Sequence, residues 1–115
     1  LVRRICKRCG KLRKPTIQEL KKIKDELKRV PKNIKIPQIK KCQHCNFTGY
    51  QGRMGVFEVF LIDDEVERLI MKSPTAASLQ ELAVKKGMVP IKQDGLMRVL
   101  GGETSLEEIE RVFGE

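Results

Sequence analysis

The chain has 115 residues, and its 24 Lys/Arg and 15 Asp/Glu give a formal net charge of +9. Only 4% of the residues are aromatic and none is Trp, so an apolar core must be built from Leu, Ile, Val and Met. No run of about 18 apolar residues exists, so the sequence encodes no transmembrane helix, and its start does not resemble a secretory signal peptide. The length suits one ordinary domain or two small packed modules.

The positive charge is concentrated in the first part of the chain. Residues 1–45 carry 16 Lys/Arg and 3 Asp/Glu, a net charge of +13, whereas residues 46–115 carry 8 and 12, a net charge of −4. Clustered Lys and Arg are attracted to polyanions such as nucleic acids and anionic lipid headgroups. The chain begins with Leu1 rather than Met, in a segment that reads as the middle of an element, so we expect a fragment of a longer protein.

Two cysteine hooks organise the first half of the chain. Cys6 and Cys9 enclose two residues, Cys42 and Cys45 enclose two more, and these are all four cysteines. Two such hooks supply the four thiolates of a tetrahedral metal site, and zinc suits closed sites of this kind. A single rubredoxin-like iron uses the same ligands, and two disulfides or four packed thiols are further alternatives.

The residue after each hook supports the metal interpretation. A metal-binding knuckle bends sharply there and favours a residue that tolerates a positive φ, and Gly10 and Asn46 occupy the two places. His44 lies inside the second hook, but the four cysteines already complete the ligand set. Because four thiolates leave no coordination position open for water, the predicted site is structural.

An amphipathic helix is predicted between the hooks, over about residues 16–29. Thr16 and Glu19 form a capping-box pattern, and Pro31 stops the helix. Its apolar positions, at steps of three and four, are Ile17, Leu20, Ile23, Leu27 and Val30. Its cationic positions are Lys21, Lys22, Lys24, Lys28 and Arg29. Such a face is either simply solvated or contacts a polyanion, and the lack of aromatic residues from 1 to 46 favours a membrane surface over single-stranded nucleic acid.

Residues 31–62 are expected to be largely extended. Ile34, Ile36 and Ile39 alternate with polar positions on the way to the second hook. The run Val56–Leu61 reads as a strand with Glu58 inside it, and Arg53 is the nearest candidate partner for that carboxylate.

The remainder of the chain has the pattern of four short helices. They are predicted over about 64–72, 75–86 and 90–100, and from Ser105 onward. Asp63 and Ser105 are placed as N-caps, and Gly87 as a C-terminal glycine. The sequence therefore predicts an α+β fold, in which a four-cysteine zinc module with short strands and one inserted helix covers residues 1–62. A compact four-helix tail follows over residues 63–115.

The sequence offers no catalytic centre. It contains no phosphate-binding GxxxxGK(S/T) segment, and its single histidine lies inside a metal hook. Neither a nucleotide site nor a Ser-His-Asp arrangement can be placed on these residues. We therefore expect no catalysis from this fragment itself.

The ordered set of motifs resembles the C-terminal region of bacterial type II secretion and type IV pilus assembly ATPases. The matching residues are Arg3-Arg4, both hooks, Thr48-Gly49-Tyr50, Gly52-Arg53, Gly55, Glu58, Gly87-Met88, Asp94-Gly95, Gly102-Glu103-Thr104-Ser105-Leu106-Glu107-Glu108 and Arg111-Val112. The very basic linker of residues 11–41 and the run Val89-Pro90-Ile91 depart from the family pattern, which leaves the secretion and pilus branches both open.

The resemblance implies a cytoplasmic motor, peripheral to the inner membrane and usually hexameric, whose ATP hydrolysis drives pseudopilus or pilus extension. Cys6, Cys9, Cys42 and Cys45 are then ligands of a structural zinc, whereas ATP and Mg²⁺ bind only elsewhere in the parent protein. The implied partners are the rest of the ATPase, neighbouring subunits of a homohexamer and an inner-membrane platform protein. Contact of the helix Lys21–Arg29 with anionic lipid is a further expectation from its charge. The alternative function is a stand-alone basic zinc ribbon that binds nucleic acid.

Overall fold

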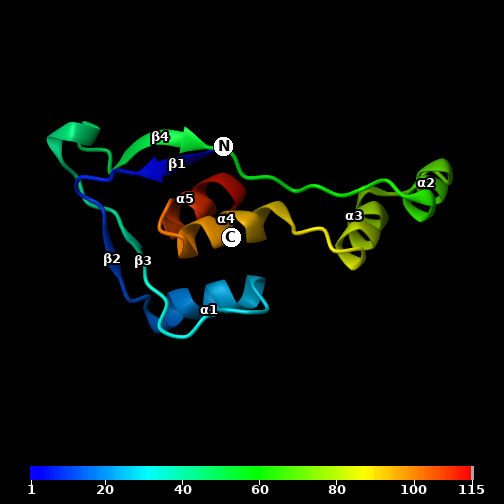
Figure 1. Cartoon of the computed structure of the whole chain (residues 1–115), viewed down its shortest axis with the longest axis horizontal. Coiled ribbons are helices and arrows are strands. Elements are labelled where there is room, and N and C mark those ends of the chain that lie inside the picture. The colour runs from blue at the N-terminus through cyan, green and yellow to red at the C-terminus, as the bar shows by residue number, and fades with distance from the viewer. Residues whose placement is uncertain (115) are drawn as a thin grey trace. The chain divides into compact units, whose positions relative to one another are not determined.

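The computed structural model describes residues 1–114 and contains two compact units (Figure 1). One unit combines residues 1–56 with the chain from Lys92 onward, and the other comprises residues 57–91. The described residues form five α-helices, one short 3₁₀ helix and two antiparallel sheets of two strands each. The α+β class with a four-cysteine cluster is therefore confirmed. No helix in the described part of the chain is long and apolar enough to cross a membrane.

Two antiparallel ribbons lead away from the cysteine hooks. Strand β1 (Val2–Ile5) pairs with β4 (Tyr50–Met54), with Val2 opposite Met54 and a register shift before Ile5. Strand β2 (Lys11–Arg13) pairs with β3 (Ile36–Gln38). Figure 1 shows β2 and β3 running together from the cysteine end to α1. In β1 the buried positions are its two apolar ends, which is why this strand forms and faces the core.

Helix α1 (Ile17–Glu26) begins as predicted but ends earlier. The Thr16 hydroxyl accepts from the Glu19 N–H and the Glu19 carboxylate accepts from the Thr16 N–H, so the capping box is present. The backbone becomes extended at Leu27, three residues after the last basic residue of the helix. Ile23 and Leu27 are buried, whereas Ile17 is 89% exposed and does not face the core.

Helix α5 (Leu106–Phe113) packs against β1, and α4 (Ile91–Leu100) packs against α5. The Ile5 N–H donates to the Glu103 carbonyl over 3.0 Å, and the Thr104 hydroxyl donates to the Arg3 carbonyl over 2.8 Å. A Cβ added at Gly95 would lie 2.8 Å from the Ile109 Cδ1 atom. Glycine therefore permits the close crossing of the two helices.

The second unit is a pair of short helices, α2 (Asp64–Met71) and α3 (Ala76–Lys85). The carboxylate of Asp63 and the hydroxyl of Thr75 cap their N-termini, and Gly87 adopts φ of +103° after α3, as the sequence predicts. The buried apolar residues of this unit are Val66, Ala83 and Met88. Its core is thin.

The prediction of a strand at Val56–Leu61 is wrong. The strand lies earlier, at Tyr50–Met54, and residues 55–63 have no regular secondary structure. Glu58 does not pair with Arg53, since its carboxylate accepts a hydrogen bond from the Ile91 N–H over 3.0 Å. Propensity and alternation favour a strand here, but within the described chain no second strand lies beside these residues to pair with.

The compact units differ from the predicted division into residues 1–62 and 63–115. The sequence groups all four later helices, whereas in the structure α4 and α5 belong with the cysteine hooks and only α2 and α3 form the other unit. Helical periodicity identifies each helix but carries no information on which neighbour it packs against. The division into independently folding domains stays a prediction.

Candidate metal centre

The fold brings the four cysteine sulfurs into one cluster. All four Sγ atoms lie within 4.8 Å of one another. The Cys6 and Cys42 sulfurs are 3.8 Å apart, the Cys9 and Cys45 sulfurs 3.8 Å, and the Cys42 and Cys45 sulfurs 3.7 Å. A disulfide would hold two sulfurs about 2.05 Å apart. The four cysteines are therefore free thiols arranged around a common centre.

These separations match the needs of a tetrahedral metal. With metal–sulfur bonds of about 2.3 Å, the edge of the sulfur tetrahedron is about 3.8 Å. Two of the cysteines are buried and two are partly covered, so the centre is shielded on most sides. Four sulfur donors suit zinc or a single iron and fill the tetrahedron without a place for water. His44 is exposed and is not part of the cluster.

The second hook has the backbone that its sequence predicts. Residues Gln43–Cys45 form one 3₁₀ turn, and Asn46 follows with φ of +53° and ψ of +37°. Phe47 is also left-handed, at φ of +60°, and its N–H donates to the Cys42 carbonyl over 2.9 Å. Asparagine tolerates this region better than most residues, which explains its place after the hook.

The first hook uses its glycine for a different reason. Gly10 is not among the residues with a positive φ, so the prediction of a left-handed Gly10 is wrong. A Cβ added there would lie 2.3 Å from the Ile5 Cγ2 atom and 2.6 Å from the Cys6 carbonyl oxygen. The Gly10 N–H also donates to that carbonyl over 2.9 Å. Close approach of the backbone, rather than a special φ, requires glycine at this position.

Backbone N–H groups stabilise the thiolate form of Cys45. Burial raises the pKa of the Cys45 thiol, but hydrogen bonds from the N–H groups of Cys42 and Gly49, at 3.4 and 3.3 Å, outweigh it and bring the pKa to about 6. A backbone hydrogen bond at Cys9 lowers the pKa of Cys6. Burial and the neighbouring sulfurs raise the pKa of Cys9 to about 12. Four thiolates so close together need a cation among them.

A buried carboxylate, Glu108, lies next to β1 and was not among the predicted site residues. Glu108 is 1% exposed and accepts hydrogen bonds from the Arg3 N–H, the Arg3 guanidinium and the Arg111 guanidinium. Burial raises the pKa of Glu108, but these donors hold it at about 2. The sequence pointed to this residue only through the capping-box pattern formed by Ser105 and Glu108. In the structure one of the two capping hydrogen bonds is present, from the Glu108 N–H to the Ser105 hydroxyl.

Aromatic stacking extends this cluster towards the second hook. The Arg3 guanidinium lies 4.2 Å from the centre of the Tyr50 ring, and the Tyr50 and Ser105 hydroxyls are 2.6 Å apart. Arg3 thus links β1, β4 and α5, a few residues before Cys6.

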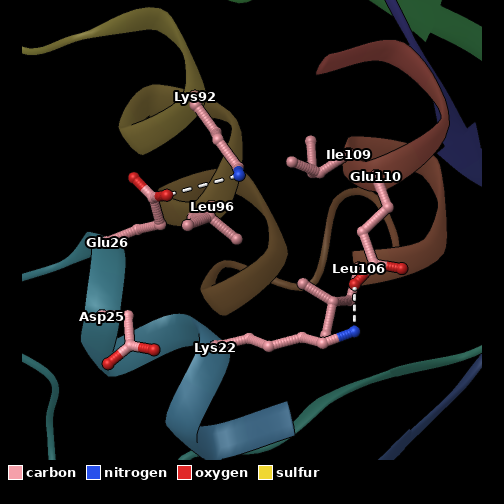
Figure 2. Close-up of a pocket in the computed structure, with 8 residues that line it drawn as sticks. All are labelled: Lys22, Asp25, Glu26, Lys92, Leu96, Leu106, Ile109 and Glu110. Atoms are coloured by element: carbon pink, nitrogen blue, oxygen red, sulfur yellow. Dashed lines mark hydrogen bonds and ion pairs between the residues drawn. The ribbon is translucent and has the colours of Figure 1, made fainter. Parts of the chain in front are cut away.

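Helix α1 is attached to α4 and α5 by ion pairs around a small pocket. The Lys22 Nζ lies 2.9 Å from a Glu110 carboxylate oxygen and the Lys92 Nζ 3.3 Å from one of Glu26. Figure 2 draws both pairs as dashed lines. The pocket has a volume of about 260 Å³, and Leu96 of α4 lies at its apolar floor. Lys22, one member of the predicted cationic face, thus pairs with a carboxylate of α5 while its side chain stays 62% exposed. Lys24, Lys28 and Arg29 form no ion pair with any described residue.

Taken together, fold and site define a small α+β protein with a four-cysteine centre able to hold one metal ion. The model of the type II/IV secretion system protein family matches residues 1–111, and the chain belongs to that family. This confirms the resemblance seen in the sequence.

The relatives include both type IV pilus assembly ATPases and type II secretion proteins. The chain is 33% identical over 109 residues to the type IV pilus assembly ATPase PilB of Thermus thermophilus, which covers 95% of this chain and 12% of that protein. It is 45% identical over 71 residues to the type II secretion system protein HxcR of Pseudomonas aeruginosa, covering 62% and 15%. It is 33% identical over 113 residues to the type IV pilus assembly ATPase TfpB of Acinetobacter baylyi, covering 97% and 19%. The chain thus spans less than a fifth of the length of each.

Proposed function

We propose that this chain is the C-terminal structural and coupling module of a cytoplasmic, hexameric ATPase that powers pilus or pseudopilus assembly at the inner membrane. The supporting observation is the family match over residues 1–111 together with relatives named as assembly ATPases. The module itself contributes shape and contacts, and ATP and Mg²⁺ bind elsewhere in the parent protein. Its partners are the rest of the ATPase, neighbouring subunits and a platform protein in the membrane.

In this proposal Cys6, Cys9, Cys42 and Cys45 hold a structural zinc ion. The support is the cluster of four sulfurs, in which the three separations of 3.7–3.8 Å match the edge of a zinc–thiolate tetrahedron. When bound, the ion offsets the charge of the thiolates and cross-links both hooks. Elemental analysis of the purified parent should give one zinc per chain. A red protein with one iron per chain would favour the iron alternative, and a metal-free folded protein would contradict both.

The decisive experiment for the function compares the full-length parent with its Cys42→Ser/Cys45→Ser variant. We expect the variant to lose zinc and to lose pilus assembly or secretion in cells, because the coupling module no longer folds. Replacing His44 with Ala is the matched control and should change neither. Normal assembly by a zinc-free variant would contradict the proposed coupling role.

The basic residues within and just after α1 are proposed to contact anionic lipid. Lys24, Lys28 and Arg29 are exposed and have no ion-pair partner among the described residues, which suits attraction to a negative membrane surface. Co-sedimentation with anionic vesicles should fall markedly in Lys24→Ala/Lys28→Ala. The pair Lys40→Ala/Lys41→Ala removes the same charge beside the cysteines and controls for net charge. Equal losses in both variants would leave α1 without a special role.

A nucleic-acid-binding zinc ribbon is the alternative function, because residues 27–57 contain no Asp or Glu. Such binding should weaken steeply with salt and should survive deletion of residues 63–115. The structure speaks against a free-standing ribbon of this kind, since α4 and α5 form one unit with the cysteine module and that deletion would expose its core.

A further inference from the structure

The segment Phe57–Ile62 is an exposed apolar run without secondary structure. Five of its six residues are large and apolar, and their exposed fractions run from 36% for Phe60 to 86% for Leu61. An isolated exposed apolar side chain is ordinary, but a contiguous run of this length marks a surface that is normally covered.

The backbone of residues 59–62 lacks hydrogen-bond partners in the described chain. Within the described chain, Val59, Phe60, Leu61 and Ile62 make no hydrogen bond through their N–H or carbonyl groups. Extended residues with free donors and acceptors are what a neighbouring strand pairs with. Val, Ile and Phe are also the residues that most favour strands. Sequence and backbone therefore agree on a strand that lacks its partner.

The two faces of the segment differ in how exposed their side chains are. Glu58 binds the Ile91 N–H, and Phe60, two residues on, is the least exposed of the apolar five. Val59 and Leu61, which alternate with them, are 75% and 86% exposed. Side chains alternate between the two faces of a strand, so the face that carries Val59 and Leu61 is the more exposed one, although Ile62 on the opposite face is also 63% exposed.

The register of the β1–β4 pair indicates which part of a longer protein could pair with the segment. Val2 pairs with Met54 and Arg3 with Arg53 in antiparallel order. A chain that continued β1 in this register before Val2 would pair with the residues that follow Met54. The relatives are more than five times longer than the matched region, so most of such a parent lies outside residues 1–115.

We propose that Phe57–Ile62 is a β-strand that completes a sheet in the part of the parent ATPase that precedes Leu1. Backbone hydrogen bonds to a strand of the same polypeptide hold it, and its Val59 and Leu61 face packs into that region's core. The inference rests on the proposed function in so far as it requires a longer parent. The segment then attaches this module non-covalently to that region.

Hydrogen exchange of the full-length parent tests the pairing directly. Peptides covering residues 57–62 should exchange on the order of a thousandfold more slowly than an unstructured chain, as paired core strands do. Exchange at the rate of the exposed turn at residues 31–35 would overturn the proposal. Protection that disappears when the hexamer is diluted to monomers would also overturn it, because a second copy would then supply the partner strand.

A pair of matched side-chain variants tests the packing. Leu61 and Ile17 are equally exposed in this chain, at 86% and 89%. Leu61→Ser should lower the Tm of the full-length parent by several degrees and speed exchange in residues 57–62, whereas Ile17→Ser should change neither. Equal effects of the two substitutions would contradict a buried Leu61.

The two proposals fail separately. A protected segment in a parent that hydrolyses no ATP and assembles no filament would support the strand and contradict the proposed function. An unprotected segment in a fully active ATPase would contradict the strand alone. The proline variant Val59→Pro, against Val59→Thr, adds a backbone test, because only proline removes the N–H and should abolish protection.

Discussion

The two compact units differ in the number of independent interactions that stabilise each of them. The first unit has the sulfur cluster, two strand pairs, the buried Glu108 and a chain of buried apolar residues from Val2 to Ile109. The second has two helix caps, three buried apolar residues and the surface ion pairs of Lys86 with Asp63 and Glu65. Exposed ion pairs contribute little to stability. We infer that residues 57–91 owe much of their stability to surfaces outside this chain.

Removing a cysteine should have the largest effect on the first unit. Cys42→Ser takes one ligand from the centre, and because structural zinc contributes about 10–16 kcal/mol to folding in small modules, the hooks and both ribbons should unfold. Circular dichroism melting and zinc content measure this. His44→Ala is the control. An unchanged melting curve with no bound metal would show that the apolar core alone holds the unit.

Breaking the buried carboxylate cluster should come next. Glu108→Gln leaves the Arg3 and Arg111 guanidinium groups facing a neutral amide, and we expect a loss of about 2–3 kcal/mol. The value lies below the roughly 3–5 kcal/mol for breaking a fully buried pair, because the Arg3 side chain is 40% exposed and keeps some contact with water. Denaturant titration measures it. Glu107→Gln, at the more exposed neighbouring residue, should lower the free energy of unfolding far less. Equal losses in the two variants would show that the Glu108 cluster does not stabilise the first unit specifically.

A matched pair of valines tests the contrast between the units. Val99 and Val66 are both fully buried, in the first and second unit respectively. Val99→Ala should cost about 2 kcal/mol, whereas Val66→Ala should cost clearly less in this chain, because local opening of a thin unit limits the loss. Denaturant titration and hydrogen exchange of both variants give the comparison. A larger cost for Val66→Ala would show that the second unit is the better packed.

The smallest effect is expected at the start of α1. The Arg13 guanidinium, 2.7 Å from both Glu19 oxygens, lowers the pKa of Glu19 to about 2. A carboxyl with a depressed pKa stabilises the fold above its unfolded value of about 4.3 and loses that contribution as the pH falls towards 2. Glu19→Gln should therefore cost about 1 kcal/mol at pH 7 and almost nothing near pH 2.

Comparing Glu19→Gln with the unsubstituted chain at each pH cancels the acid-induced loss of metal, which affects both. A difference that does not shrink between pH 5 and pH 2 would mean that Glu19 acts through packing rather than charge.

The sequence predicted best where a local pattern determines the structure. The hooks, the cap at Thr16, the left-handed Asn46 and the glycine after α3 depend on neighbouring residues, and each is confirmed. It failed where the outcome depends on a distant group. Gly10 is needed because of the Ile5 side chain, and Glu108 is buried because Arg3, more than a hundred residues away, arrives beside it. The strand at Val56–Leu61 failed because the described chain lacks the neighbour that its pattern anticipates.

Strand β1 has a mechanical consequence. Along its four residues it is bonded sideways to β4, to the Glu103 and Thr104 corner and to the Glu108 carboxylate, and its next residue is Cys6. A pull along the strand would load these bonds in parallel shear, so they would have to break together rather than one after another. Tension applied at Leu1 would then reach the sulfur cluster and α5 together, because β1 is bonded to both regions.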